Sequence, residues 1–205
     1  METISSIYIT IQTLVMAYIE LNNRLPGITG LLENRTDTAA PIRELTQILL
    51  RGKNTLTEME RELVATIVSF KNQCRFCMNA HAATVIALGG NQELLDKVYY
   101  DLENAPLSEK MKSLLVIGSK VQEIGKAVQP EHISRAKNAG ATDKEIHDTV
   151  LIAALFCLYN RYVDGMGTFC PEDPAYYQKL ASRLVTIGYD RPKDVLARQG
   201  EENFK

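Results

Sequence analysis

Apolar positions recur at intervals of three and four along most of the chain, and little of the sequence alternates between apolar and polar residues. A period near 3.6 is typical of amphipathic helices, whereas strands alternate with a period of two. The first set of such regularly spaced apolar positions predicts an amphipathic helix over residues 4–22. The run 150–159 is apolar on all sides and predicts a helix in the centre of the core. The pattern as a whole predicts an all-α fold.

Helix-breaking and helix-capping residues divide this pattern into segments. The stretch 24–30, RLPGITG, is expected to end the first helix, and Pro41 is expected at the start of a helix that runs to residue 51. Two Thr-x-x-Glu capping boxes, one beginning at Thr57 and one at Thr142, predict two further helix starts.

The length and composition predict one domain. A chain of 205 residues can bury a full core, and 45% apolar with 23% charged residues is typical of a globular protein. No low-complexity segment or linker divides the sequence. We therefore expect a single all-α domain over 1–205, a helical bundle that ends in a polar tail over 191–205.

Charge and the N-terminal residues exclude several classes of protein. The 23 basic and 25 acidic residues are spread along the chain and form no basic block, so nucleic acid is not favoured as a partner. The N-terminal stripe has no positively charged start and is interrupted by polar residues, unlike a signal peptide or a membrane span. We expect no membrane association and a cytoplasmic location, where thiols stay reduced unless catalysis oxidises them.

The segment 72–81, NQCRFCMNAH, concentrates the candidate chemistry. Cys74, Cys77 and His81 are separated by three and four residues, so one helix would present all three on the same face. Asn72 is suited to a turn or cap between two helices, which would make Cys74 an early residue of its helix. Unpaired N–H groups at a helix start favour a thiolate, and this predicts a lowered pKa for Cys74.

Glu62 is placed to join this group. If the chain reverses near Asn72 as a helical hairpin, Glu62 lies ten residues before the turn and His81 nine after it, so the two come opposite one another. Carboxylate, imidazole and thiol in series would form a proton relay to Cys77. The second cysteine can then close a disulfide after the first has been oxidised.

Other uses of these residues remain open. A c-type haem site needs His directly after the second Cys, where Met78 stands. A zinc site needs a fourth ligand, which Glu62 could supply. An iron–sulfur cluster would also require Cys157 and Cys170, and Cys157 lies in the apolar run. The alternatives to a redox enzyme are therefore a zinc-binding or redox-sensing protein and a helical assembly protein with incidental cysteines.

The spacing E-x11-C-x2-C-x3-H resembles the signature of the alkylhydroperoxidase D-like, peroxidase-related branch of the carboxymuconolactone decarboxylase family. Residues 56–81 are similar to the core helical hairpin of that family, and residues 139–168 are similar to a second block of its peroxidase-related members. With the preceding helices the resemblance covers roughly residues 26–168. Phe76 departs from the pattern, because peroxidases of this type can carry a polar, proton-handling side chain there.

The resemblance implies an all-α bundle that assembles as a homo-oligomer, a trimer or hexamer, and an antioxidant thiol peroxidase activity. It implies that peroxide attacks Cys77, that Cys74 is its disulfide partner, and that His81 and Glu62 relay protons. An external dithiol or thioredoxin-like protein would reduce the disulfide, and no cofactor is expected, because the chain has no nicotinamide or flavin fingerprint. The lactone-decarboxylating members lack the cysteine pair, which argues against that chemistry.

Overall fold

The computed structural model describes residues 17–190, and the described part of the chain folds into helices without strands, which confirms the predicted all-α class. Most of the predicted helix 4–22 and the whole predicted tail 191–205 lie outside the described residues. In chain order the elements are α2 (Gly27–Asn34), α3 (Thr36–Arg51), α4 (Glu58–Lys71), α5 (Arg75–Ala87), α6 (Gln92–Tyr100), the 3₁₀ helix η1 (Leu102–Asn104), α7 (Glu109–Glu123), the 3₁₀ helix η2 (Gly125–Ala127), α8 (Pro130–Asn138), α9 (Asp143–Gly165) and α10 (Pro174–Thr186).

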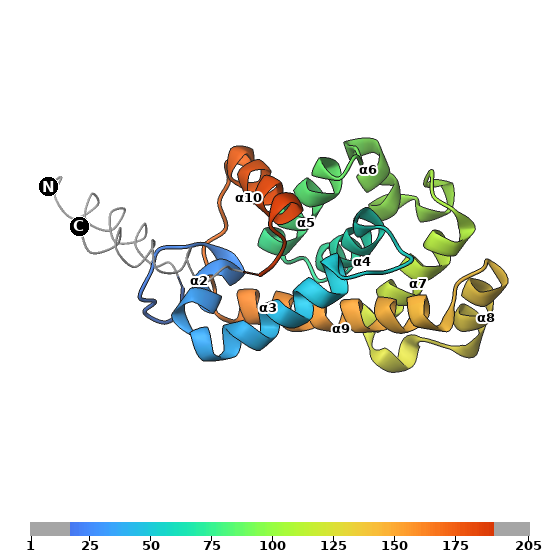
Figure 1. The fold of residues 1–205 in the computed structure, drawn as a ribbon, viewed down its shortest axis with the longest axis horizontal. Coiled ribbons are helices and arrows are strands. Elements are labelled where there is room, and N and C mark those ends of the chain that lie inside the picture. The colour runs from blue at the N-terminus through green and yellow to red at the C-terminus, as the bar shows by residue number, and fades with distance from the viewer. Residues whose placement is uncertain (1–16, 191–205) are drawn as a thin grey trace, which may run out of the picture.

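Helix α4 lies at the centre of the bundle and packs against α5, α7 and α9 (Figure 1). Its residues 61–69 are all buried, which leaves only its two ends in contact with solvent. The long α9 runs along one side of the molecule, and α10 lies beside α5. The larger of two hydrophobic clusters joins side chains of α3 through α9.

The predicted capping boxes are both confirmed. Thr57 accepts a hydrogen bond from the backbone of Glu60, whose carboxylate accepts one from the Thr57 backbone, and the same reciprocal pair joins Thr142 and Glu145. These pairs satisfy amide groups that would otherwise be unbonded in the first turns of α4 and α9. The local sequence therefore determines where the two central helices begin.

A tight turn joins α4 to α5 as an antiparallel hairpin. Gln73 adopts a left-handed conformation with φ of 60°. The side-chain amide of Asn72 donates to Oδ1 of Asn160 on α9 at 2.8 Å. The side-chain amide of Gln122 on α7 donates in turn to Oδ1 of Asn72 at 3.0 Å. The turn is thus tied to two other helices, which fixes the relative positions of residues on its two arms.

Three predicted boundaries are wrong. Residues 17–22 form bends and irregular backbone, so the predicted helix 4–22 does not continue through them. Helix α2 begins at Gly27, inside the predicted breaker 24–30; Gly27 itself takes a left-handed φ of 55°, and its amide donates to the Phe169 carbonyl. Pro41 lies inside α3 rather than at its start, and buried side chains on that helix offset the hydrogen bond that proline cannot make.

The apolar run 150–159 does form a helical part of the core, as predicted, but it is not buried on all sides. Ile152 and Phe156 are fully buried, while Ala154 is exposed and the side chain of Leu158 is 50% exposed. Since Ala154 and Leu158 are four residues apart, they share one outward face of α9. This face of α9 thus carries a pair of exposed apolar side chains near the middle of the helix.

Candidate functional site

The α4–α5 hairpin brings Glu62 and His81 into direct contact. Oε2 of Glu62 lies 2.6 Å from Nδ1 of His81, and both residues are buried, Glu62 completely. The proximity predicted from their equal distances to the turn is confirmed. Because the pair bridges the two arms of one supersecondary unit, its geometry depends mainly on the hairpin itself.

Two further side chains hold the Glu62 carboxylate in its ionised form. Nη2 of Arg51 donates to Oε1 at 2.7 Å, and the hydroxyl of Tyr189 donates to the same oxygen at 2.6 Å. Burial would raise the pKa of Glu62, but the charges of His81 and Arg51 and the hydrogen bonds from His81 and Tyr189 outweigh burial and lower it. Glu62 is therefore a buried carboxylate with both oxygens hydrogen-bonded to neighbouring side chains.

This environment fixes the orientation of His81. A carboxylate against Nδ1 keeps the proton on that nitrogen, so the lone pair of a neutral imidazole lies on Nε2. The ring packs edge-on against Phe156, with centroids 4.5 Å apart, and lies nearly parallel to the Tyr189 ring. The imidazole cannot rotate away without breaking these contacts, and Nε2 is left as the proton acceptor of the site.

The cysteines occupy different positions at the start of α5. Cys74 is the N-cap residue and is fully buried, whereas Cys77 lies in the first turn, one helical turn before His81. All four cysteines are free thiols. A hydrogen bond with Cys77 and burial raise the pKa of Cys74 well above its usual range. The predicted lowering of the Cys74 pKa is therefore wrong, because these effects outweigh that of the helix start.

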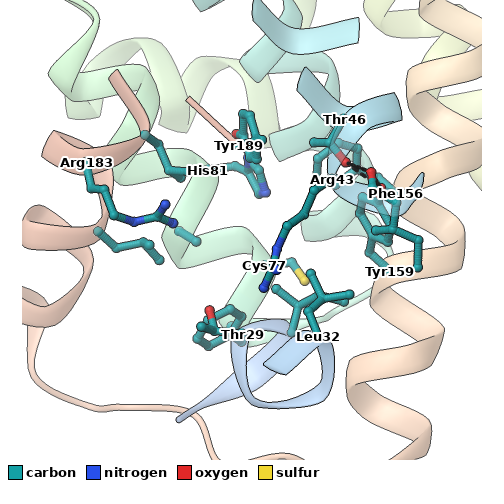
Figure 2. Close-up of a pocket in the computed structure, with 16 residues that line it drawn as sticks. Thr29, Leu32, Arg43, Thr46, Cys77, His81, Phe156, Tyr159, Arg183 and Tyr189 are labelled. Carbon is teal, nitrogen blue, oxygen red and sulfur yellow. Dashed lines mark hydrogen bonds between the residues drawn. The ribbon is translucent and has the colours of Figure 1, made fainter. Parts of the chain in front are cut away.

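Cys77 and His81 open onto one cavity of about 80 Å³ (Figure 2). This volume exceeds that of a single water molecule several-fold. Cys74 does not line the cavity, so Cys77 is the sulfur that a small molecule would meet. The hydroxyls of Thr46 and Tyr159 in the wall hydrogen-bond to one another at 2.6 Å. The apolar part of the wall comes from α2, α3, α5, α9 and α10: Ile28, Leu32, Ile42, Phe76, Ala80, Phe156, Leu180 and Leu184.

Phe76, the residue between the cysteines, is a packing residue. Its ring lies against Gly27 of α2 and makes tilted contacts with Tyr176 and Tyr177 of α10. It is 3% exposed and forms part of the cavity wall. Its role is to join α5 to α2 and α10 beside Cys77.

Several residues of the site escaped the sequence analysis. Arg51 precedes Glu62 by eleven residues, and Tyr189 follows it by 127, so neither stands in a local pattern with the motif. Arg43 and Arg183 also line the cavity. In most sequences an arginine on an amphipathic helix is simply exposed to solvent. Only the folded arrangement distinguishes these three arginines from such exposed residues.

The remaining cysteines lie outside the Glu62–His81 contact. Cys157 accepts a weak contact from the Asn72 amide at 3.6 Å, and Cys170 lies 3.1 Å from the hydroxyl of Tyr177. Within residues 17–190, no group of three or more histidine, cysteine and acidic side chains is arranged to hold a metal ion. In the same part of the chain, no helix combines the length and apolar character needed to cross a bilayer.

Comparison with known proteins gives a match to one family model and several structures of the same fold. Residues 36–100 match the model of the carboxymuconolactone decarboxylase family. The structure is similar to that of an uncharacterized peroxidase-related protein from Silicibacter sp. TM1040, with a TM-score of 0.67 and 22% identity over 86% of this chain and 87% of that one. No curated protein matches the chain significantly.

Two further solved structures share this fold. One is an uncharacterized peroxidase-related protein from Ralstonia eutropha JMP134, described as an alkylhydroperoxidase AhpD core, with a TM-score of 0.70 and 20% identity over 81% of this chain and 96% of that one. The other is a protein of unknown function from Agrobacterium tumefaciens, suggested to be the antioxidant defence protein AhpD, with a TM-score of 0.63 and 16% identity over 70% and 97% of the two chains. At these identities the likeness concerns the fold.

Proposed function

We propose, from the match of residues 36–100 to the model of the carboxymuconolactone decarboxylase family, that the chain is a thiol-dependent peroxidase. Cys77 would react with a hydroperoxide and Cys74 would resolve the product, with His81 and Glu62 moving the protons. The observation that supports this most is the buried Glu62–His81 pair one helical turn from Cys77, with His81 and Cys77 in the wall of one cavity.

In the first step Nε2 of His81 takes the proton of the Cys77 thiol. The thiolate then attacks the terminal oxygen of the hydroperoxide, the O–O bond breaks, and the leaving alkoxide takes the proton back from His81 as an alcohol. Cys77 becomes a sulfenic acid, so sulfur is oxidised by two electrons and the peroxide is reduced by two. Glu62 stabilises the imidazolium that forms between the two proton transfers.

In the second step Cys74 attacks the sulfur of Cys77. The Cys74 proton and the sulfenic hydroxyl leave as water, and a Cys74–Cys77 disulfide forms. The high pKa of Cys74 suits this order, because a neutral thiol does not compete for peroxide. An external dithiol, such as a thioredoxin-like protein of the cytoplasm, then supplies two electrons and two protons and restores both thiols. No cofactor takes part in this scheme.

The test is stopped-flow consumption of tert-butyl hydroperoxide by reduced protein, with dithiothreitol as the electron donor. We expect turnover by the wild type, none by Cys77→Ser, and one equivalent consumed by Cys74→Ser with a sulfenic acid that dimedone traps. Cys157→Ser, a cysteine outside the pair, is the matched control and should turn over. A wild type as inert as Cys77→Ser would overturn the proposal, and bound zinc found by elemental analysis of that protein would favour the metal-binding alternative.

We also propose that the chain forms a homo-oligomer, a trimer or hexamer, through the apolar face of α9. The exposed Ala154 and Leu158 on one face are of the kind that subunit contacts bury. Multi-angle light scattering should give a mass three or six times that of the chain, and Leu158→Glu should lower it. A monomer at all concentrations would contradict this assembly.

A further inference from the structure

Arg183 differs from the other arginines around the cavity. Arg43 forms an ion pair with Glu33, and Arg51 forms one with Glu62. Among residues 17–190, Arg183 has neither an ion pair nor a side-chain hydrogen bond, although it lies in the last turn of α10 and lines the cavity. Figure 2 shows its guanidinium extending from α10 into the cavity.

An unpaired guanidinium in a partly buried position is costly, because burial removes water without supplying an acceptor. Burial and the nearby charge of Arg43 lower the pKa of Arg183, and the charge of Glu33 opposes this shift without cancelling it. A guanidinium still stays protonated at neutral pH. Arg43 and Arg183 have one nearby carboxylate between them, that of Glu33, so the cavity keeps an excess of one positive charge.

The arrangement of the wall specifies what would neutralise it. Cys77 and His81 come from α5, Arg183 comes from α10, and mainly apolar side chains line the space they enclose. A ligand that fits has an apolar body, a reactive group at Cys77 and an anionic group at Arg183. The planar guanidinium matches a carboxylate with two parallel hydrogen bonds, and one free positive charge matches one negative charge.

We propose that the cavity binds carboxylates through Arg183 and that the physiological substrate is a small organic hydroperoxide that carries a carboxylate. The substrate part of this inference rests on the proposed peroxidase function. The carboxylate-binding part does not, because it depends only on Arg183 and the cavity wall.

The kinetic test compares 4-hydroperoxy-4-methylpentanoate with its methyl ester, which has the same hydroperoxide and no charge. For the wild type, kcat/KM should be about 10- to 100-fold higher for the acid than for the ester, because a charge-assisted hydrogen bond usually contributes this much. Arg183→Gln should bring this ratio close to one, and Arg183→Lys should retain part of it. Arg135 is an exposed residue of the distant α8 and pairs with Glu103. Arg135→Gln should leave the acid-to-ester ratio of kcat/KM unchanged. Turnover of both compounds with equal kcat/KM in the wild type would overturn the inference.

A binding measurement separates this inference from the peroxidase proposal. Pivalate, titrated by calorimetry into the reduced protein, should bind to wild type and Arg135→Gln and bind at least about tenfold more weakly to Arg183→Gln. If pivalate binds in this way and neither hydroperoxide is turned over, the peroxidase proposal fails and the carboxylate site stands. If pivalate does not bind, or if inorganic phosphate binds as tightly, the carboxylate site is overturned whatever the peroxidase activity.

Discussion

Glu62 and His81, nineteen residues apart in sequence, meet at 2.6 Å across the α4–α5 hairpin, and Glu62 is inaccessible to solvent. A carboxylate buried this completely is stable only when cations and donors surround it, and Arg51 and Tyr189 complete that set. The contact therefore serves both as the support of the imidazole and as part of the stability of the bundle.

Glu62→Gln should reduce both activity and stability. The amide cannot stabilise an imidazolium, so peroxide reduction should fall about 100-fold, in the usual range for acid–base catalysis. It also leaves Arg51 without its buried partner, which should lower the free energy of unfolding by about 3 kcal/mol. Urea unfolding and stopped-flow kinetics on the same protein give both numbers.

Glu58→Gln is the matched control, because Glu58 contacts the same Arg51 at 3.5 Å from a side chain that is 39% exposed. An exposed pair of this kind contributes at most about 1 kcal/mol. Equal losses of activity and stability in the two variants would mean that Glu62 contributes no more than the exposed Glu58, and the relay would be contradicted.

The two cysteines of the pair should differ in reactivity toward iodoacetamide. Cys74 is fully buried and has a raised pKa, whereas Cys77 lines the cavity, so Cys77 should be alkylated at least about tenfold faster at pH 7.5. Trypsin cleaves after Arg75, which separates the two residues into different peptides for mass spectrometry. Faster labelling of Cys74 would reverse the assigned order of peroxide attack and resolution.

Glu145 should contribute a defined part of the acid sensitivity. Burial would raise its pKa, but hydrogen bonds from Lys110, Thr142 and Thr55 lower it to about 2. With an unfolded pKa near 4.5, its stabilisation is fully present above that pH and is lost as the pH falls toward 2. Between pH 6 and pH 3 the wild type should therefore lose about 2 kcal/mol more than Glu145→Gln in urea unfolding. Glu44→Gln, at an exposed position, is the control and should lose as much stability as the wild type between pH 6 and pH 3. If Glu145→Gln loses the same amount as the wild type, the assignment to Glu145 is contradicted.

Gly27→Ala should destabilise the fold. At this residue φ is 55°, and an added Cβ would lie 2.3 Å from the ring of Phe76. The backbone strain and the clash together should cost about 2 kcal/mol, seen as a lower urea midpoint. Gly125→Ala is the control, because a Cβ there meets no atom within 4 Å. Similar midpoints for the two variants would show that Phe76 can move away from α2 without cost.

The sequence by itself determined the helical class, the starts of α4 and α9, and the facing of Glu62 and His81. Each of these depends on residues close together in the chain: a 3.6-residue period, a reciprocal cap such as that of Thr57 and Glu60, and equal distances from one turn. Such local interactions have the same geometry in nearly any tertiary setting, and they can be predicted without it.

Tertiary structure decided the surroundings of that pair. It supplied Tyr189 from 127 residues beyond Glu62, and it brought Arg183 of α10 to the cavity wall. It also reversed the predicted pKa shift of Cys74, because burial and the neighbouring thiol outweigh the helix start. Burial, pKa and cavity shape depend on which distant surfaces pack together, and neither the period nor the caps of a single helix contain that information.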